Sequence, residues 1–381
     1  MRPISSSGNF SASIVRKSIS QRIDRDSRDR SSRSEHRVYY AIFAGRKEVM
    51  EIHFQYTDMM LQLGLVTEVH VWDFTNGNTS NSDYLSSYMR NTKLAGYRVF
   101  VKSMTQINHR PSENGRTSYL WYSFYEHYLN NKRYLPQDIL IKADDDIVFV
   151  DISSFQAFIE AVANSTEKSL HFPNIINNDV GFVVQYDRIH GAPELQRWMA
   201  YYTVEPHQFN FKQLFNDYLP HSSRWFDVYL HYGIKMSAPI TTWEDGAFTK
   251  PEFAQDMHRV FLRNPSLYLH QLHNSELPRR VFFNQRIPIN MYAAKFAVIR
   301  DIYRLFLEEH CCDDEDFLGA FPTLKNHSHI VHSYHAVSHL ASYLQYEQLI
   351  TTSSILSEYL EMAIDLVTEF RKQSNGYRLK Q

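Results

Sequence analysis

From residue 38 to residue 150, two patterns of apolar positions alternate along the chain. Short, uninterrupted apolar runs predict strands at Val38–Ala44, Val69–Phe74, Tyr97–Ser103 and Asp138–Ala143. Between them, apolar side chains at helical spacing predict helices at residues 48–63, 84–95 and Ser118–Asn130, and a polar stretch predicts a loop at Thr75–Asp83. Strands that alternate with helices at this spacing predict βαβ units, and therefore an α/β fold with a mostly parallel sheet.

The pattern is looser after residue 151. It predicts a helix at Ser153–Ala163, a short strand at Ser169–Phe172, a turn at Asn174–Asp179 and a helix at Phe296–Glu309. Residues 190–285 are rich in aromatic side chains and predict loops with short helices. Residues 341–372 predict one or two amphipathic helices, with an apolar face made of Ile355, Leu356, Tyr359, Leu360, Ala363, Leu366, Val367 and Phe370.

Composition divides the chain into three parts. Residues 1–36 are rich in Ser, Arg and Asp and poor in apolar side chains, so we expect them to be disordered. This composition suits a solvated tail as well as a targeting, export or interaction segment. Residues 37–345 form the expected α/β domain, and residues 346–381 form the helical segment.

Charge and hydrophobicity narrow the classes of protein. The 381 residues are 43% hydrophobic and 22% charged, which is ordinary for a soluble globular enzyme. We find no apolar run of about 20 residues for a membrane span and no signal-peptide pattern near the start, so we expect a cytoplasmic protein. The two cysteines, Cys311 and Cys312, are adjacent and indicate no disulfide framework. The net charge of −2 includes a positive excess before residue 38, so the acidic remainder disfavours nucleic-acid binding.

Three consecutive carboxylates give the strongest chemical signal. Asp144, Asp145 and Asp146 follow the predicted strand Asp138–Ala143, and a second apolar run, Ile147–Val150, comes next. Side chains two residues apart at the end of a strand can point the same way. Carboxylate oxygens suit Mg²⁺ or Mn²⁺, and ligands of open α/β sheets bind at the carboxyl ends of strands. The triplet therefore predicts a divalent-cation site, with an acidic turn or helix cap as the structural alternative.

Several blocks in sequence order resemble a known family. They are Gly45–Arg46 after the first strand, the acidic triplet, FPNIINND at Phe172–Asp179, RIPIN at Arg286–Asn290, DDEDFL at Asp313–Leu318 and HAVSHLASYLQ at His335–Gln345. Together they resemble a GT-A-type, nucleotide-sugar-dependent glycosyltransferase with a DxD motif, of a group with microbial and viral members. The resemblance covers about residues 37–345. It implies a Rossmann-like GT-A fold and sugar transfer from a nucleoside-diphosphate sugar with Mn²⁺ or Mg²⁺.

The resemblance also implies roles for individual residues. Asp146 would bind the metal, Asp144 would contact the ribose or a metal-bound water and so share the metal site, and Asp145 would reach the metal or the nucleotide. His339, in its VSH context, would be the remote metal ligand, whereas the neighbouring histidines would be surface or core residues. Side chains expected near the base, diphosphate or donor sugar are Arg46, Asp73, Thr75, Asn177 and Asn178; the two asparagines suit a polar turn equally well.

An acid pair before the metal histidine is the expected source of the catalytic base. In inverting members of the family such an acid removes the proton of the acceptor hydroxyl, so the resemblance implies Asp314, then Asp313, and an inverting outcome. Helix capping by acids is the structural alternative. Trp243-Glu244-Asp245-Gly246 is a second acid pair. Acceptors would be hydroxyls of a glycan, glycolipid or protein.

Other classes remain open at this level. A phosphohydrolase of the HAD type would use Asp144, Asp146 and Val148, but its motif ends the first strand of the fold, and here about three βα units precede it. A zinc hydrolase using His335 and His339 lacks the Glu of HExxH. A non-catalytic carbohydrate-binding or interaction protein would explain the 14% aromatic content but not the acid triplet.

Overall fold

The computed structural model describes eleven segments of the chain. They are residues 36–75, 78–92, 94–100, 119–166, 168–178, 192–195, 250–269, 279–282, 289–309, 327–341 and 343–378. The expected tail up to residue 35, both members of the Asp313–Asp314 pair and the second acid pair, Glu244–Asp245, lie outside these segments.

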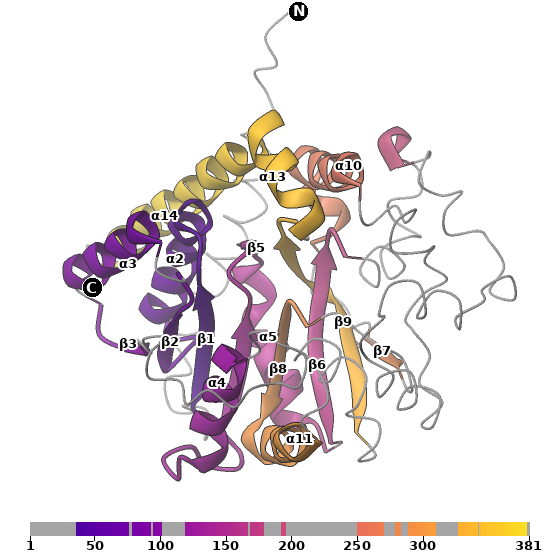
Figure 1. The fold of residues 1–381 in the computed structure, drawn as a ribbon. Helices are drawn as coiled ribbons and strands as arrows, with labels where there is room; N and C mark the ends of the chain where they lie inside the picture. Colours follow the sequence, from indigo (N-terminus) through magenta and orange to yellow (C-terminus); the bar gives the residue numbers. More distant parts are fainter. Residues whose placement is uncertain are drawn as a thin grey trace, which may run out of the picture.

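Within the described segments, nine strands form one sheet, in the order β3-β2-β1-β4-β8-β6-β9-β5, with β7 paired to β9 (Figure 1). The strands are β1 Val38–Ala44, β2 Glu68–Asp73, β3 Tyr97–Phe100, β4 Ile139–Ala143, β5 Ile147–Val150, β6 Ser169–Ile176, β7 Arg279–Phe282, β8 Met291–Lys295 and β9 Ser328–His339. Strands β3, β2, β1 and β4 are parallel neighbours. Strand β8 is antiparallel to β4 and β6, and β6 is parallel to β9. Strands β1, β2, β4, β6 and β9 therefore end at the same edge, here called the carboxyl edge; the opposite one is the amino edge.

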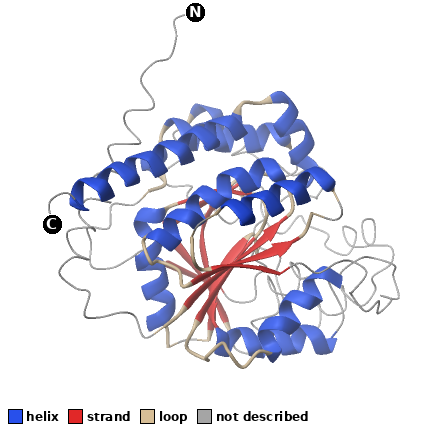
Figure 2. Cartoon of the chain, turned by 90° about the vertical axis from the view of Figure 1, so that its left-hand side faces the viewer, coloured by secondary structure: helices blue, strands red, loops and turns tan. Residues whose placement is uncertain are grey.

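Helices cover both sides of the sheet (Figure 2). They are α2 Lys47–Gln62, α3 Thr79–Asn91, α4 Tyr119–Asn130, α5 Ile152–Asn164, α10 Pro251–Arg263, α11 Phe296–Glu309, α13 Tyr343–Thr352 and α14 Ile355–Arg378, with a short 3₁₀ helix, η4, at Pro265–Leu267. Helices α4 and α11 contact each other, whereas α2 and α5 pack on strands and α14 packs against α2. The expected α/β architecture with flanking and C-terminal helices is confirmed. No helix in the described part is long and apolar enough to cross a membrane.

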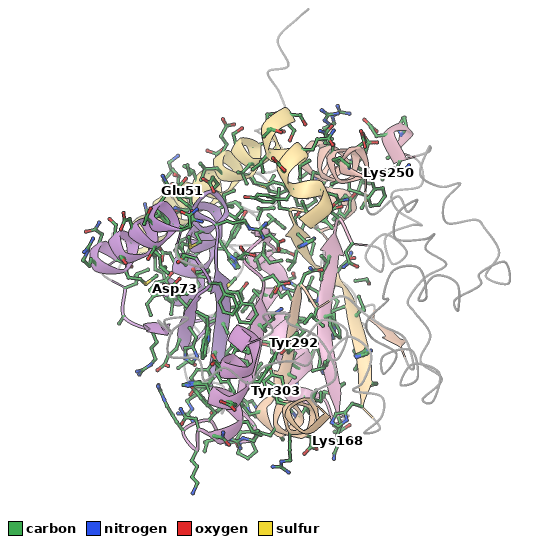
Figure 3. The ribbon with its side chains drawn as sticks, viewed as in Figure 1. Glu51, Asp73, Lys168, Lys250, Tyr292 and Tyr303 are labelled. Carbon is green, nitrogen blue, oxygen red and sulfur yellow. The ribbon has the colours of Figure 1, made fainter. Side chains whose placement is uncertain are left out.

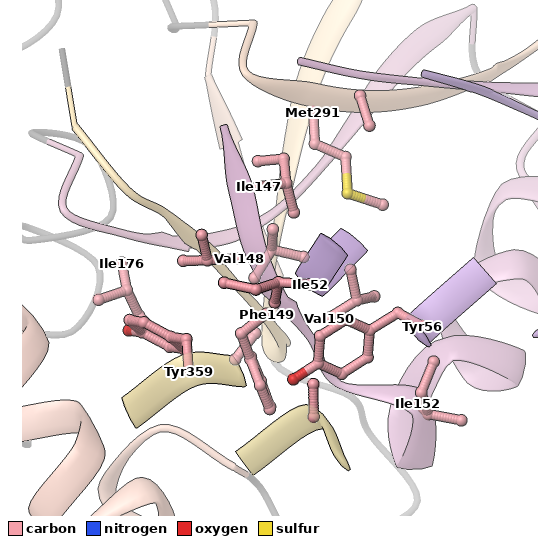
Figure 4. Close-up of a cluster of buried hydrophobic side chains, with 14 of the residues drawn as sticks. Ile52, Tyr56, Ile147, Val148, Phe149, Val150, Ile152, Ile176, Met291 and Tyr359 are labelled. Carbon is pink, nitrogen blue, oxygen red and sulfur yellow. The ribbon is translucent and has the colours of Figure 1, made fainter. Parts of the chain in front are cut away.

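Strand β1 shows why the central strands are continuous apolar runs. Its side chains alternate between two covered faces, and all seven residues are buried. On one face, the ring centroids of Tyr39 and Tyr134 are 4.9 Å apart. On the other face, the hydroxyl of the next residue, Tyr40, shares a hydrogen bond with His53 Nε2 of α2 at 3.0 Å. The main cluster of buried side chains continues from α2 to β5 and the C-terminal helix, where Tyr56, Phe149 and Tyr359 lie close together (Figure 4).

Two boundaries differ from the sequence prediction. Helix α3 begins at Thr79, inside the predicted loop Thr75–Asp83, because the Asn78 side chain caps it by accepting a hydrogen bond from Asn81 N at 3.1 Å. Strand β6 continues to Ile176, so Asn174 lies in the strand and not in the predicted turn. The register against β9 shifts between Pro173 and Asn174, which lets the strand pass a residue that has no amide hydrogen. The turn begins at Asn177, in the left-handed region with φ 58°.

The two edges can be followed in the side-chain view. In Figure 3, Lys250, directly before α10, lies at the end of the molecule where the carboxyl edge is, and Lys168, directly before β6, lies at the other end. Tyr292 of β8 and Tyr303 of α11 meet between these ends and share a hydrogen bond through their hydroxyl groups. Helices α10 and α13 contact each other above the carboxyl edge (Figure 1).

Candidate functional site

The carboxyl edge gathers most of the side chains that the sequence singled out. Arg46 follows β1, the acidic triplet joins β4 to β5, Asn177 and Asn178 follow β6, and His339 ends β9. The backbone ties these strand ends together, because Asp144 N donates to Asn290 O at 2.8 Å and Leu340 N donates to Asp146 O at 2.8 Å. Segments separated by up to about 290 residues in sequence, from Arg46 to His339, thus share one site through the topology of the sheet.

Asp146 and His339 form a buried pair. His339 Nε2 lies 3.0 Å from Asp146 Oδ2, and the two side chains are 4% and 10% exposed. Burial opposes the charged forms, but the attraction between the two groups is stronger. It holds the pKa of Asp146 well below its usual range, with help from Arg46, and it raises the pKa of His339. The pair therefore favours the imidazolium form of His339, which donates to this carboxylate.

Arg46 neutralises the other side of the triplet. Its Nε and one terminal nitrogen donate to the two carboxylate oxygens of Asp145 at 2.8 and 2.6 Å, and the terminal nitrogen also lies 3.1 Å from Asp146 Oδ2. Burial raises the pKa of Asp145 even though Arg46 opposes that rise. The guanidinium stacks 4.2 Å from the ring centroid of Tyr346, in α13. Gly45 permits this arrangement, since a Cβ atom there would lie 2.6 Å from Asp145 Oδ2.

Asp144 has a different partner from Asp146. The buried ammonium of Lys142, two residues earlier in β4, donates to Asp144 Oδ1 and to Ile289 O, the latter at 3.2 Å. The same ammonium lies 4.9 Å from the ring centroid of Phe43. The Asp144 carboxylate is 23% exposed, more than that of Asp146. Each carboxylate of the triplet thus has a basic partner: Lys142 for Asp144, Arg46 for Asp145, and His339 with Arg46 for Asp146.

The two asparagines after β6 are engaged within the protein. Asn177 Nδ2 donates to Leu340 O at 3.0 Å and to Gln345 Oε1 at 3.2 Å, and Asn177 O faces His339 Nδ1 at 3.4 Å. Asn178 Nδ2 donates to Asn290 Oδ1 at 3.1 Å. Both side chains are buried. Asp73, at the end of β2, accepts hydrogen bonds from Thr75 N and Thr75 Oγ1 at 3.0 and 2.7 Å, which closes a local turn.

The residues present fit a divalent cation in one specific respect. Asp146 Oδ1 is buried and has no hydrogen-bond partner among the residues that the structure describes. A buried carboxylate oxygen without a partner is costly, and it is the atom to which a cation would bind. Beside it, an imidazole and a second carboxylate supply ligand types that Mn²⁺ accepts. Among the described residues, no group of three or more His, Cys, Asp or Glu side chains is arranged so that it could hold a metal ion. Mg²⁺ often has only one or two carboxylate ligands and completes its shell with water and substrate phosphates.

Comparisons with known proteins add little to this geometry. No protein-family model and no curated protein sequence matches this chain. Matches among solved structures include a 2-C-methyl-D-erythritol 4-phosphate cytidylyltransferase from Francisella tularensis, at 14% identity and a TM-score of 0.23. The similarity covers 36% of this chain and 56% of the cytidylyltransferase. A TM-score this low assigns neither a fold nor an activity.

Sequence reasoning missed four side chains of the site: Lys142, Tyr346, Gln345 and His258, the last of which donates from α10 to Leu340 O at 2.6 Å. A charge within the apolar run DILIKA was a usable signal for Lys142, because a lysine in a buried strand needs an anionic partner. Tyr346 and Gln345 lie in α13 and come to the site only through the packing of that helix. Nothing in the local sequence distinguishes His258 from the other eighteen histidines.

Proposed function

We propose that this protein is a metal-dependent glycosyltransferase that moves a sugar from a nucleoside-diphosphate sugar to a hydroxyl of a glycan, glycolipid or protein. One observation carries the proposal. Asp146, with an unpartnered buried oxygen, lies between His339 and Arg46 at the carboxyl ends of parallel strands. In this arrangement the Asp146 carboxylate can bind a cation, and the neighbouring Arg46 guanidinium can bind a phosphate group. A metal-bound diphosphate needs both kinds of contact.

In this proposal Asp146 and His339 hold Mn²⁺ or Mg²⁺, and Asp144 lies next to them to contact the metal, its water or the ribose. The cation would neutralise charge on the nucleoside diphosphate as it leaves. Arg46 is the phosphate contact nearest the cation, and Asp145 holds its guanidinium in place through two hydrogen bonds. Asp73, Asn177 and Asn178 are the proposed contacts to the nucleoside and the donor hydroxyls, and the two buried asparagines would have to exchange hydrogen bonds within the protein to make these contacts.

The proposed transfer inverts the anomeric centre, with Asp314 as the base and Asp313 as the second candidate. The base takes the acceptor's hydroxyl proton while the oxygen attacks the anomeric carbon and the diphosphate leaves. Asp314→Asn should lower turnover by roughly 10²- to 10⁴-fold and leave donor affinity unchanged, as measured by calorimetry beside steady-state rates. Near wild-type turnover would remove Asp314 from this role and reopen Asp313, Glu244 and Asp245.

A donor screen tests the proposed function directly. Full-length protein with Mn²⁺ is heated with each of a panel of nucleotide sugars, and one donor should raise the melting temperature, because binding at about 100 times the dissociation constant adds roughly 2.7 kcal/mol. That donor is then incubated with hydroxyl acceptors, and sugar transfer is followed by mass spectrometry. Phosphate release without an acceptor would instead support a phosphohydrolase. Stabilisation by sugars alone, without nucleotide or metal, would support a carbohydrate-binding protein.

A further inference from the structure

The backbone of Leu340, directly after His339, is held at both of its polar groups. Its backbone N–H donates to Asp146 O, and the nitrogen and the oxygen are 2.8 Å apart. Its carbonyl oxygen accepts from Asn177 Nδ2 at 3.0 Å and from His258 Nε2 at 2.6 Å. A carbonyl oxygen has two lone pairs, so both acceptor positions are filled. Leu340 therefore connects three elements: the acidic triplet, the turn after β6 and helix α10.

The hydrogen bonds of His258 fix which of its nitrogens carries the proton. A carbonyl can only accept, so Nε2 is the protonated nitrogen and Nδ1 is the acceptor. Tyr359 OH lies 2.9 Å from Nδ1, and Ser338 Oγ lies 2.8 Å from Tyr359 OH and 3.3 Å from Nδ1. A consistent chain of donors runs from the Ser338 hydroxyl to Tyr359, on to His258 Nδ1, and from Nε2 to Leu340 O. All four residues are fully buried.

This chain of hydrogen bonds contacts β9 at the residues on both sides of His339. Ser338 and Leu340 are its sequence neighbours, and both contact the network of His258. Side chains alternate along a strand, so the imidazole of His339 points away from the face where the Ser338 hydroxyl meets His258. On its own face, His339 meets Asp146 through Nε2 and Asn177 O through Nδ1. The orientation of the His339 ring thus depends on the backbone at the end of β9, which His258 fixes from the opposite face by its hydrogen bond to Leu340 O.

We infer that His258 is a positioning residue for His339: by donating to Leu340 O it fixes the end of β9, so that the His339 imidazole faces Asp146 in a geometry suited to a divalent cation. The inference rests on the metal site of the proposed function. Partners behind a metal ligand typically change metal affinity by about 10- to 100-fold when removed. His258 exerts its effect through the backbone of the ligand, while Asn177 O is the group that contacts the ligand's second nitrogen.

The test uses the Mn²⁺ affinity of the full chain without nucleotide, measured by electron paramagnetic resonance of free Mn²⁺. His258→Phe keeps a ring but removes the donor, and it should raise the dissociation constant roughly 10- to 100-fold. His258→Gln keeps an N–H donor and should restore affinity close to wild type. His335→Phe is the matched control. His335 is a buried histidine of β9, the strand that carries His339, but it shares its hydrogen bond with Ser154 of α5, at 2.8 Å. It should leave Mn²⁺ affinity unchanged at a similar cost in melting temperature.

Two further variants keep the outcome decisive. If His258→Phe does not fold, Asn177→Gly removes the other donor to Leu340 O while keeping the left-handed backbone and its carbonyl, and it should weaken Mn²⁺ binding in the same direction. Folded His258→Phe with wild-type affinity overturns the inference, as does nuclear magnetic resonance of ¹⁵N-histidine in the metal-free protein if His258 carries its proton on Nδ1. His339→Gln separates the two levels: unchanged Mn²⁺ binding in that variant overturns the proposed metal site itself.

Discussion

The two edges of the sheet both collect acidic and basic side chains, but the hydrogen bonding of their carboxylates differs. At the amino edge, Asp138 accepts from Arg37 N, from two guanidinium nitrogens of Arg37 and from Leu135 N, at 3.2, 3.1, 2.7 and 2.8 Å. Both of its oxygens are satisfied. Glu68 likewise receives hydrogen bonds from Arg98 and Arg133, whose side chains are 49% and 37% exposed. These groups hold the start of β1 to the loop before β4, and they hold β2 to β3 and to the same loop.

At the carboxyl edge, Asp146 keeps one oxygen without a partner among the described residues, although its other oxygen meets both Arg46 and His339. Partly satisfied buried groups weaken a fold, so they are retained where a ligand uses them. Charge clusters alone therefore do not mark a site in this molecule. A buried acceptor that the protein leaves open separates the candidate metal site from a structural ion-pair cluster.

Metal removal should give the largest effect and should act on the carboxyl edge alone. EDTA is expected to abolish the proposed sugar transfer, and Mn²⁺ or Mg²⁺ should restore it, because in that proposal the leaving diphosphate needs a cation. The metal-free protein should stay folded in EDTA, since Arg46 and Lys142 pair with Asp145 and Asp144, but its melting temperature should be lower than with saturating Mn²⁺, because a ligand that binds only the folded state stabilises it. Transfer rates and thermal unfolding are measured on the same sample. Full activity in EDTA would contradict the metal assignment.

A matched pair of Asp→Asn variants compares the edges directly. Asp146→Asn should lower Mn²⁺ affinity by roughly 100-fold or more, beyond the effect of an outer partner, while the protein remains folded. Asp138→Asn should leave Mn²⁺ affinity unchanged but reduce the free energy of unfolding by about 1.5–3 kcal/mol, because it weakens hydrogen bonds to a charged group. Calorimetric titration and denaturant unfolding give the two quantities. The same pattern in both variants would mean that the edges do not differ in function.

Much of the fold could be predicted from apolar patterns, because both faces of the central strands are covered. The prediction of Val38–Ala44 matches β1, and that of Phe296–Glu309 matches α11. Strand β9 had no such signal. Its sequence, SHIVHSYHAVSH, places buried histidines and serines among apolar residues, so neither period stands out. Its burial depends on partners such as Ser154 and His171, which the strand's own residues do not reveal.

The candidate site was predictable only in its ligand types. Three carboxylates after an apolar strand indicated a cation, and a histidine near the end of the domain entered through the family resemblance. The contact between Asp146 and His339 arises from the pairing of β5 with β9, where Ile147 lies opposite His339. Such pairing joins residues almost 200 positions apart, and no local pattern encodes it. Lys142 as the partner of Asp144 is likewise a product of packing.

Acid should weaken both edges, and at the carboxyl edge part of the loss comes from His258. At the amino edge, burial lowers the pKa of His70 beside Glu68, so this edge also loses stability as the pH falls below about 6.5. Burial lowers the pKa of His258 to about 4, so between pH 6.5 and pH 4 the unfolded chain binds a proton that the folded chain does not. Stability should fall across that window by up to about 3 kcal/mol from this group. Hydrogen bonds from His70 and Arg98 lower the pKa of Glu68 to about 2 despite burial, so its stabilisation is lost only below about pH 4.5.

Denaturant unfolding at pH 7 and pH 4.5 checks the contribution of His258. His258→Gln has no titrating ring and should lose less stability than wild type between these pH values. Part of the loss should remain, because burial also lowers the pKa of His53, to about 3. Identical pH dependence in wild type and His258→Gln would show that His258 does not contribute to the acid sensitivity of this edge.

The smallest expected effect concerns the aromatic contact of an arginine at each edge. Arg46 lies 4.2 Å from the ring centroid of Tyr346, whereas Arg37 at the amino edge lies 5.7 Å from that of Tyr39. The closer contact holds the guanidinium that also binds Asp145. Tyr346→Leu removes the ring and should lower the free energy of unfolding by about 1 kcal/mol, whereas Tyr346→Phe keeps the ring and should stay near wild type. Urea unfolding of the three proteins measures the difference, and repeating it in 1 M salt should shrink the gap only slightly, because a partly buried contact is weakly screened. If the Leu and Phe variants lose the same free energy of unfolding, the effect comes from the Tyr346 hydroxyl and not from the ring. The contact of Arg46 with Tyr346 would then stabilise the fold no more than the longer contact of Arg37 with Tyr39.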